Sequence, residues 1–450
     1  MASAPANPPR PRKIFPLTFL WRRREPLKFL SELTADTPDI AVIQVGPQVI
    51  AVIKNPALIQ QVLVADSAHT DKGRTAEREL FFTFLGEGLL NARGETHRRQ
   101  RRLMMPGFHR ARIKGYADLI TASTLARTQD WRDGDEREVN KEMMDLALVV
   151  VGRTLFSSDV TEASHAITQG FDQLTRNVGR MILPGARWLL QSPLPFAKRV
   201  RDSQQQLDAA VYGLIAKRRS AGLDTGDLLS MLLLAEDAEH PGERLNDTEV
   251  RDQIMTILFT GQDPIGNTLT WVWWLLARHP EHQAALHAEV DRVLGGRSGT
   301  FDDVSQLTFT EQIVREVLRL YPPLWTLGRK ATADLEVGGH TLAPGTLLVT
   351  CQWLVQRDAR WYEAPDEFRP QRWTPEFRAA LSRFAYFPFG GGPRSCIGEN
   401  FAWMELILIV ATIAQQWRFD LSPRTTEVGP QARITLHPDR PVFLKFIRRS

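Results

Sequence analysis

One ten-residue stretch decides the fold predicted for this 450-residue chain: Phe389-Gly390-Gly391-Gly392-Pro393-Arg394-Ser395-Cys396-Ile397-Gly398. Its glycine-rich turn delivers one cysteine to the mouth of an apolar helical stretch, residues 401–417. Free backbone N–H groups and the positive end of the helix dipole favour a thiolate over a thiol at that place. A lone Cys-Ile-Gly would more simply be a tight turn around a buried structural cysteine, but the whole pattern favours a ligand cysteine.

The thiolate of Cys396 suits a heme iron, which needs a strong electron-donating axial ligand. Arg394, two residues earlier, has the charge to pair with a heme propionate. The other cysteine, Cys351, lies in an apolar strand-like run and is predicted to belong to the core. Two cysteines without a Cys-x-x-Cys pair are too few for a zinc or iron–sulfur site.

Two segments before the cysteine carry charges that could meet. Glu316 and Arg319 are three residues apart in Glu316-Val317-Leu318-Arg319, so they share one helix face. On their own they would form an everyday helix salt bridge. A third charge, Arg372, follows in the aromatic- and arginine-rich segment Phe368-Arg369-Pro370-Gln371-Arg372-Trp373.

The longest predicted helix begins after Asn246, which can form a capping box with Glu249, and runs to Ala277 before His279-Pro280. Its length is about 45 Å at ~1.5 Å per residue. The centre of this helix reads Thr260-Gly261-Gln262-Asp263-Pro264-Ile265-Gly266-Asn267-Thr268. Because proline lacks the N–H that would return to Thr260, we expect Pro264 to open the helix there.

The remaining pattern predicts a mainly α protein with a minor β region. Helical spacing and caps predict a helix from Pro280 to the glycines at 295–296, and a second capping box at Thr308 predicts a helix through Leu320. The predicted strands are Ile40–Val45 and Val49–Ile53, which form a hairpin, and Leu347–Thr350, Ile434–Leu436 and Val442–Phe446.

Composition excludes several classes of protein. A net charge of +4 is too small for a dedicated nucleic-acid binder, and no Gly-x-Gly-x-x-Gly marks a flavin or nicotinamide domain. The apolar stretch Ile14–Trp21 is interrupted by Pro16 and is far shorter than the ~20 residues of a membrane span. We expect a cytoplasmic monomer, since two cysteines fit a reducing compartment. Residues 1–13 are expected to form a flexible leader. His279 and His282 are expected to be exposed to solvent.

The cysteine segment resembles the ligand loop of the cytochrome P-450 family. The Glu316 and Arg372 segments and the centre of the long helix match the family in the same order along nearly the whole chain. The resemblance implies the P-450 fold as a single domain over residues 14–450, with heme b bound through Cys396 as the metal ligand. It also implies that Glu316, Arg319 and Arg372 form a buried charge network that fixes the cysteine loop.

The resemblance assigns further roles around the heme. Propionate and loop contacts would come from His97, Arg101, Arg329, Arg394 and Phe389, although Gln356 stands where many relatives carry a histidine. On the long helix, Gly261 would let heme and dioxygen approach the backbone. Asp263 occupies the acid position of the family's acid–alcohol pair, but Pro264 replaces the alcohol. This departure puts the ordinary proton relay in doubt.

The residues expected to line the substrate pocket are apolar or aromatic: Phe82, Phe84, Phe259, Leu324, Trp325 and Leu327. Such a wall favours a lipophilic small molecule, of the kind met in secondary metabolism. The resemblance implies a monooxygenase that hydroxylates or oxidatively cyclises this substrate. The alternatives are peroxide-driven oxidation, dehydration or nitrogen-group transfer by the same heme, and a heme-binding sensor without turnover.

A basic run extends from Arg98 to Lys114 and contains no acidic residue. Such a run is usually a solvated helix face. Its other interpretation is a docking patch for an acidic ferredoxin or flavodoxin, centred on Arg98, Arg99 and Arg102, which would supply electrons.

Overall fold

The computed structural model describes residues 12–15, 25–72, 84–156, 192–222, 226–237 and 239–449. The chain divides into two compact units, each assembled from separate segments. The first comprises Met1–Gly73, Gln312–Cys396 and Gly429–Asp439, and the second comprises Arg74–Glu311, Ile397–Val428 and Arg440–Ser450.

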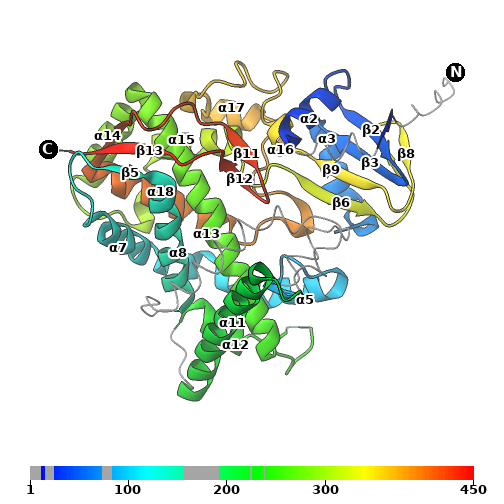
Figure 1. The fold of residues 1–450 in the computed structure, drawn as a ribbon, viewed down its shortest axis with the longest axis horizontal. Coiled ribbons are helices and arrows are strands. Elements are labelled where there is room, and N and C mark those ends of the chain that lie inside the picture. Colours follow the sequence, from blue (N-terminus) through cyan, green and yellow to red (C-terminus); the bar gives the residue numbers. More distant parts are fainter. Residues whose placement is uncertain are drawn as a thin grey trace. The chain divides into compact units, whose positions relative to one another are not determined.

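A six-stranded sheet with the order β1-β2-β3-β9-β6-β4 forms the centre of the first unit (Figure 1). Its strands are β1 (Arg12–Ile14), β2 (Ile40–Val45), β3 (Gln48–Ile53), β4 (Thr70–Asp71), β6 (Leu327–Ala331) and β9 (Leu347–Thr350). The predicted hairpin is confirmed, because β2 and β3 pair antiparallel. Ala51 and Ile53 pack into one core cluster while Ile50 and Val52 pack into another, so β3 is apolar on both faces.

Strand β1 shortens the predicted flexible leader. Arg12 and Lys13 pair with Ile43 and Gln44 in parallel register, so these two residues belong to the sheet. The predicted strand 434–436 is also displaced, since the observed β12 begins at Leu436. The other elements of the first unit are α2 (Pro26–Leu33), α3 (Pro56–Gln60), η1 (Gln61–Ala65), η2 (Ser67–His69), β7 (Leu335–Val337), β8 (His340–Leu342), α16 (Gln352–Val355), η5 (Pro370–Arg372), α17 (Pro375–Ala380), η6 (Arg383–Ala385), η7 (Gly392–Arg394), β11 (Pro430–Ala432) and β12 (Leu436–Pro438).

The second unit is mainly helical (Figure 1). Its helices are α5 (Gly94–Met104), η3 (Met105–Phe108), α6 (Arg110–Gly115), α7 (Ala117–Thr128), α8 (Val139–Phe156), α11 (Pro195–Ala221), α12 (Leu228–Leu234), α13 (Asp247–Arg278), α14 (Pro280–Leu294), η4 (Phe301–Asp303) and α18 (Glu399–Gln416). A small antiparallel sheet completes it, in the order β10 (Trp417–Leu421), β13 (Phe443–Arg448) and β5 (Glu136–Glu138). Among the described residues, no helix combines the length and apolarity needed to cross a membrane.

Helix α13 is the long helix that the sequence predicts. Its capping box is present: the Asn246 side chain accepts from the Glu249 N–H at 2.9 Å, and the Glu249 carboxylate accepts from the Asn246 N–H at 3.0 Å. The helix ends at Arg278, one residue beyond the prediction. Almost all of its side chains between Val250 and Leu276 are buried, so α13 is the central helix of its unit.

Helix α15 (Thr308–Leu320) contributes residues to both units, and its cap differs from the prediction. Thr308 lies inside the helix rather than before it. The buried Glu289 carboxylate of α14 accepts hydrogen bonds from the Phe309 N–H at 2.7 Å and from the Thr310 N–H at 2.8 Å. A carboxylate from another helix thus satisfies the first amides, a contact that no local pattern can reveal.

Candidate active site

Backbone hydrogen bonds shape the loop that carries Cys396. The Cys396 N–H donates to the Phe389 carbonyl at 3.0 Å, and the Gly390 N–H donates to the Phe387 carbonyl at 2.9 Å. The loop is therefore a closed turn, and Cys396 is exposed at its end. Three residues later, Glu399 begins α18.

Two glycines let this turn pack closely against Leu63 and Phe384 of the first unit. Gly392 has a φ of 70°, and a Cβ there would lie 1.9 Å from the Leu63 carbonyl oxygen of η1. A Cβ on Gly391 would lie 2.4 Å from the Phe384 ring. A larger residue at either position would push the turn away from its support, so the glycines fix where the thiol is presented.

A pair of cations lies in the same unit as Cys396. Arg329 on β6 is buried, and its guanidinium donates to the Gly328 carbonyl at 3.0 Å. Burial, followed by repulsion from Arg394, lowers the pKa of Arg329 to about 10, so the side chain stays charged at neutral pH. Arg394 pairs with Asp71 at 3.5 Å. Two neighbouring cations with one nearby carboxylate would be stabilised by a further anion, as a heme propionate would provide.

Three of the predicted pocket residues come from the segment that leads into β6. Leu324 is 38% exposed, while Trp325 and Leu327 are half-buried. The Trp325 indole donates to the Arg433 carbonyl at 2.9 Å, which fixes the ring. Leu327 packs beside the cysteine loop, since a Cβ on Gly390 would lie 3.3 Å from its side chain.

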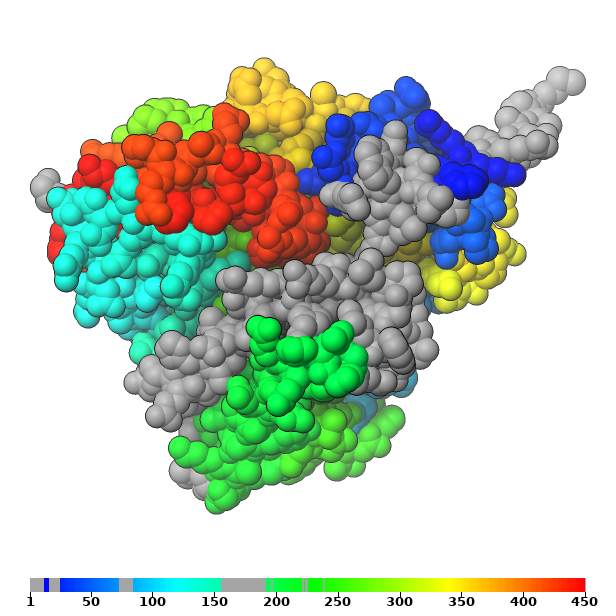
Figure 2. Space-filling model, in the orientation of Figure 1, coloured from blue at the N-terminus to red at the C-terminus, as the bar shows by residue number. Residues whose placement is uncertain are grey.

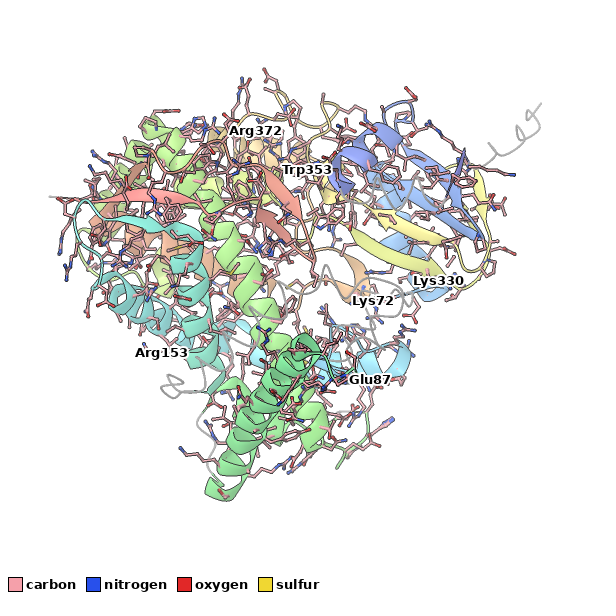
Figure 3. All side chains as sticks on the ribbon, viewed as in Figure 1. Lys72, Glu87, Arg153, Lys330, Trp353 and Arg372 are labelled. Atoms are coloured by element: carbon pink, nitrogen blue, oxygen red, sulfur yellow. The ribbon has the colours of Figure 1, made fainter. Side chains whose placement is uncertain are left out.

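The three charged residues of the predicted network meet. The Glu316 carboxylate accepts from Arg319 at 2.8 Å and from Arg372, labelled in Figure 3, at 3.0 Å. The Trp373 indole donates to the same carboxylate at 2.9 Å, and so does the Arg369 N–H at 3.0 Å. The side chains of Glu316 and Arg319 have no exposed surface.

The hydrogen bonds of Gln356 account for an amide side chain at this position. Its side-chain N–H groups donate to the Leu318 and Arg319 carbonyls at 2.9 and 3.0 Å, and its oxygen accepts from the Phe387 N–H at 3.1 Å. These contacts satisfy the last carbonyls of α15 and tie the helix to the chain that precedes the cysteine loop. Gln356 is therefore a buried structural residue.

The other propionate candidates, His97 and Arg101, lie one turn apart on α5 in the second unit, with His97 buried and Arg101 half-buried. Phe84 and Phe259 are buried in that unit as well, each about one-twentieth exposed. The sixth pocket residue, Phe82, lies outside the described residues.

The centre of α13 differs from the prediction, because the helix continues through Pro264 without a break. Proline removes the backbone hydrogen bond to the Thr260 carbonyl, and in the following turn two side chains donate to other carbonyls of the helix. The Asn267 amide donates to the Asp263 carbonyl at 2.9 Å, and the Thr268 hydroxyl donates to the Pro264 carbonyl at 2.7 Å. Asp263 itself is buried.

Gly261 has a packing role that sequence reasoning missed. A Cβ on Gly261 would lie 2.6 Å from Val151 of α8, and a Cβ on Gly266 would lie 2.5 Å from the Met144 sulfur. The two glycines, five residues apart, let α8 approach α13 closely. This contact accounts for Gly261 without any ligand, so its part in dioxygen approach stays a prediction.

Comparisons with known proteins show the family of the chain. The family model described as Cytochrome P450 matches residues 7–446. The chain belongs to the cytochrome P450 family. P450s bind a heme iron, and the exposed thiol of Cys396 and the buried cation Arg329 fit such a group.

Relatives of this P450 include bacterial enzymes of similar length. It is 37% identical to cyclooctatin synthase of Streptomyces melanosporofaciens over 93% of this chain and 91% of the relative. It is 36% identical to pentalenene oxygenase of Streptomyces avermitilis over 95% and 94% of the two chains. A solved structure of the cytochrome P450DA heme domain matches with a TM-score of 0.85 and 25% identity, covering 95% of this chain and 94% of that one.

Acidic residues pair with the three arginines of the predicted docking patch of this P450. Arg99 pairs with Glu249 at 2.7 Å, and Arg102 pairs with Asp237 at 3.0 Å. Arg98 pairs with a residue of its own helix, Glu95, at 2.6 Å. A docking partner would have to compete with these acids, which weakens the patch that the sequence predicts.

The two histidines expected to be exposed form a small cluster with Glu281. Its carboxylate lies 3.3 Å from His279 Nδ1 and 3.8 Å from His282 Nε2. The His282 side chain is only 12% exposed, so the prediction was wrong for that residue. Carboxylate–imidazole contacts account for this arrangement, and a metal cation would be disfavoured by the positive end of α14.

Proposed function

We propose that this P450 is a monooxygenase that binds heme b through Cys396 and oxidises a terpene-like, polycyclic small molecule. The observation that carries the proposal is the closed, glycine-braced turn that presents Cys396 in the same unit as the buried cation Arg329. The names of the two Streptomyces relatives support the substrate class, because pentalenene is named as the substrate of one and cyclooctatin as the product of the other.

Separate groups of residues would bind the heme and the substrate. Cys396 would be the axial thiolate, while Arg329, Arg394, His97 and Arg101 would hold the propionates. When bound, the heme would supply the dioxygen-activating iron chemistry of the family. The apolar side chains of Phe84 and Phe259 would exclude water and orient the substrate.

Proton delivery is where this chain departs from its family. The Asp263 carboxyl would hold a proton near the reacting group, but Pro264 offers no hydroxyl to pass it on. The Thr268 hydroxyl is committed to the Pro264 carbonyl. A substrate hydroxyl or a water beside Asp263 would then complete the relay. The same feature favours, as a second candidate, peroxide-driven or other chemistry that needs no such relay.

Electrons would come from a separate ferredoxin or flavodoxin in the cytoplasm, and we propose that the enzyme works as a monomer. To test the function, purified holoenzyme should be given a surrogate ferredoxin system and a panel of cyclic sesquiterpene and diterpene hydrocarbons and alcohols. We expect some members of the panel to shift the Soret band of the heme when they bind. Each compound that causes a shift should give one oxygenated product. Heme binding without any product under these conditions or with peroxide would favour a sensor.

We expect Pro264→Thr to change coupling rather than folding. Threonine restores the hydroxyl that the relay lacks, and α13 is already continuous at this position. With a substrate from the panel, the variant should release several-fold less peroxide per electron pair consumed. Product identity and peroxide should be compared with wild type. Equal coupling and the same product in both proteins would show that Pro264 has no special part in the reaction.

A further inference from the structure

Arg251 of α13 joins two parts of the second unit through one guanidinium group. Its Nε donates to the Asp208 carboxylate of α11 at 2.8 Å, and a terminal nitrogen makes a second contact with the same oxygen. The other terminal nitrogen donates to the Asp252 carboxylate at 2.9 Å. Arg251 also donates to the Phe84 carbonyl at 2.9 Å. Only 7% of its side chain is exposed, so these bonds form largely away from water.

The next two residues of α13 hold the segment that follows Phe84. The Asp252 carboxylate accepts from the N–H of Glu87, which Figure 3 labels, at 2.8 Å. The Gln253 side-chain oxygen accepts from the Leu89 N–H at 2.9 Å. Three consecutive polar residues of α13 therefore bind the backbone of segment 84–89 at three points. Backbone contacts of this kind fix the position of the segment whatever its side chains are.

The segment also lies directly on the surface of α13. Gly86 has a φ of 65°, and a Cβ there would lie 2.1 Å from the Asp252 carboxylate. A Cβ on Gly88 would lie 2.2 Å from the Thr256 hydroxyl. The segment is thus both hydrogen-bonded and in close contact, and its position depends on the side chains of α13.

The same guanidinium group also binds α11 through Asp208. Asp208 is 29% exposed, and α11 is uncovered on the face shown in Figure 2, where it appears in green. Helix α11 packs in its unit through buried apolar side chains such as Leu207 and Val211, and the Arg251–Asp208 contact adds a charged link that fixes its position on α13. Arg251 therefore couples any movement of α11 to the segment that carries Phe84.

We propose that Arg251 is a positioning residue that sets how large a ligand the active site admits, by clamping segment 84–89 and α11 to the same turn of α13. This inference rests on the proposed function, in which Phe84 and Phe259 border the substrate. Arg251 touches no reacting atom. It acts through the positions of both Phe84 and α11, so the loss of either link should be felt most by bulky ligands and least by small ones.

Two variants and one control test the clamp. Arg251→Lys keeps the charge but loses the fork that reaches Asp208, Asp252 and Phe84 together. Asp208→Asn leaves the segment bonds intact and weakens only the link to α11. The matched control is Arg219→Gln, because Arg219 of α11 pairs with Asp247 of α13 at 2.7 Å, with both side chains about half exposed. An exposed pair of this kind contributes little.

Holoenzyme should be mixed with imidazole, a small heme ligand, and with 4-phenylimidazole, a bulky one, while the Soret shift is followed in a stopped-flow instrument. In Arg251→Lys and Asp208→Asn we expect 4-phenylimidazole to bind about five-fold faster relative to imidazole, because a charged hydrogen bond contributes at least this factor to the clamped position. Arg219→Gln should keep the wild-type ratio.

An unchanged ratio in both variants, or the same change in Arg219→Gln, would overturn the clamp while leaving the proposed function intact. If Arg251→Lys does not fold, Asp208→Asn alone decides, since its substitution lies on a partly exposed helix. Absence of any Soret shift with imidazole in the wild type would instead overturn the proposed function, and the clamp with it.

Discussion

The Cys396→Ala variant is expected to lose the red-shifted Soret band of reduced, carbon monoxide-bound heme-thiolate proteins, together with all turnover. The reason is that no other described thiol is exposed, and the closed turn from Phe389 to Cys396 presents this one at its end. The measurement is the reduced carbon monoxide difference spectrum of purified protein, with heme content determined separately.

Cys351 provides the matched control. It is fully buried, its Sγ donates to the Trp325 carbonyl at 3.4 Å, and burial raises the pKa of its thiol to about 12. A thiol of this kind stays protonated and cannot act as a ligand. Cys351→Ala should therefore keep the red-shifted band and lose only stability. A normal spectrum in Cys396→Ala, or its loss in Cys351→Ala, would overturn the assignment.

Local patterns predicted those elements whose causes are local. The capping box at Asn246, the hairpin of β2 and β3 and the stop of α14 at Gly295 each depend on residues within a few positions of one another. The cysteine segment is equally compact, so its turn and its glycines could be recognised from ten residues. Resemblance to a family supplied the partners that lie farther along the chain, such as Arg372 for Glu316.

Contacts between distant segments escaped prediction. Glu289 caps α15 from another helix, and acids after residue 236 neutralise the basic run at Arg99 and Arg102. Neither contact can be recognised from the residues that surround the helix start or the arginines in the sequence. Arg251 and Asp252 did leave a signal, because these two adjacent charged residues lie in a helix that is buried almost throughout, and buried charges are paired.

Pro264 shows that a local rule can be overruled by packing. Proline in a helix interior costs about 3 kcal/mol in an isolated helix. Here α13 is buried on nearly all sides and packs closely against α8 at Gly261 and Gly266, so the tertiary contacts keep the helix continuous despite the missing hydrogen bond. The chemical consequence of the proline, the lost hydroxyl, does not depend on a break in the helix.

Glu316→Ala is expected to be the most destabilising substitution in the first unit. The Glu316 carboxylate receives four side-chain and backbone groups, from Arg319, Arg372, Trp373 and the Arg369 N–H, and it has no exposed surface. Without it, two guanidinium groups stay buried and lose their counter-charge. Breaking such a network by removing one member costs about 3–5 kcal/mol. Thermal unfolding and heme content of the purified variant should both fall sharply.

Glu363 offers the control, since its side chain is 91% exposed and its distance to Arg369 is 3.9 Å. Glu363→Ala should change stability by less than about 0.5 kcal/mol, because an exposed ion pair is solvated in both states. Glu316→Gln tests the cause: it keeps an oxygen acceptor of the same shape but removes the charge, so it should lie between alanine and wild type. A Glu316→Ala protein with wild-type melting temperature and heme content would show that the network does not hold the cysteine loop, and that Gln356 and the glycine contacts suffice.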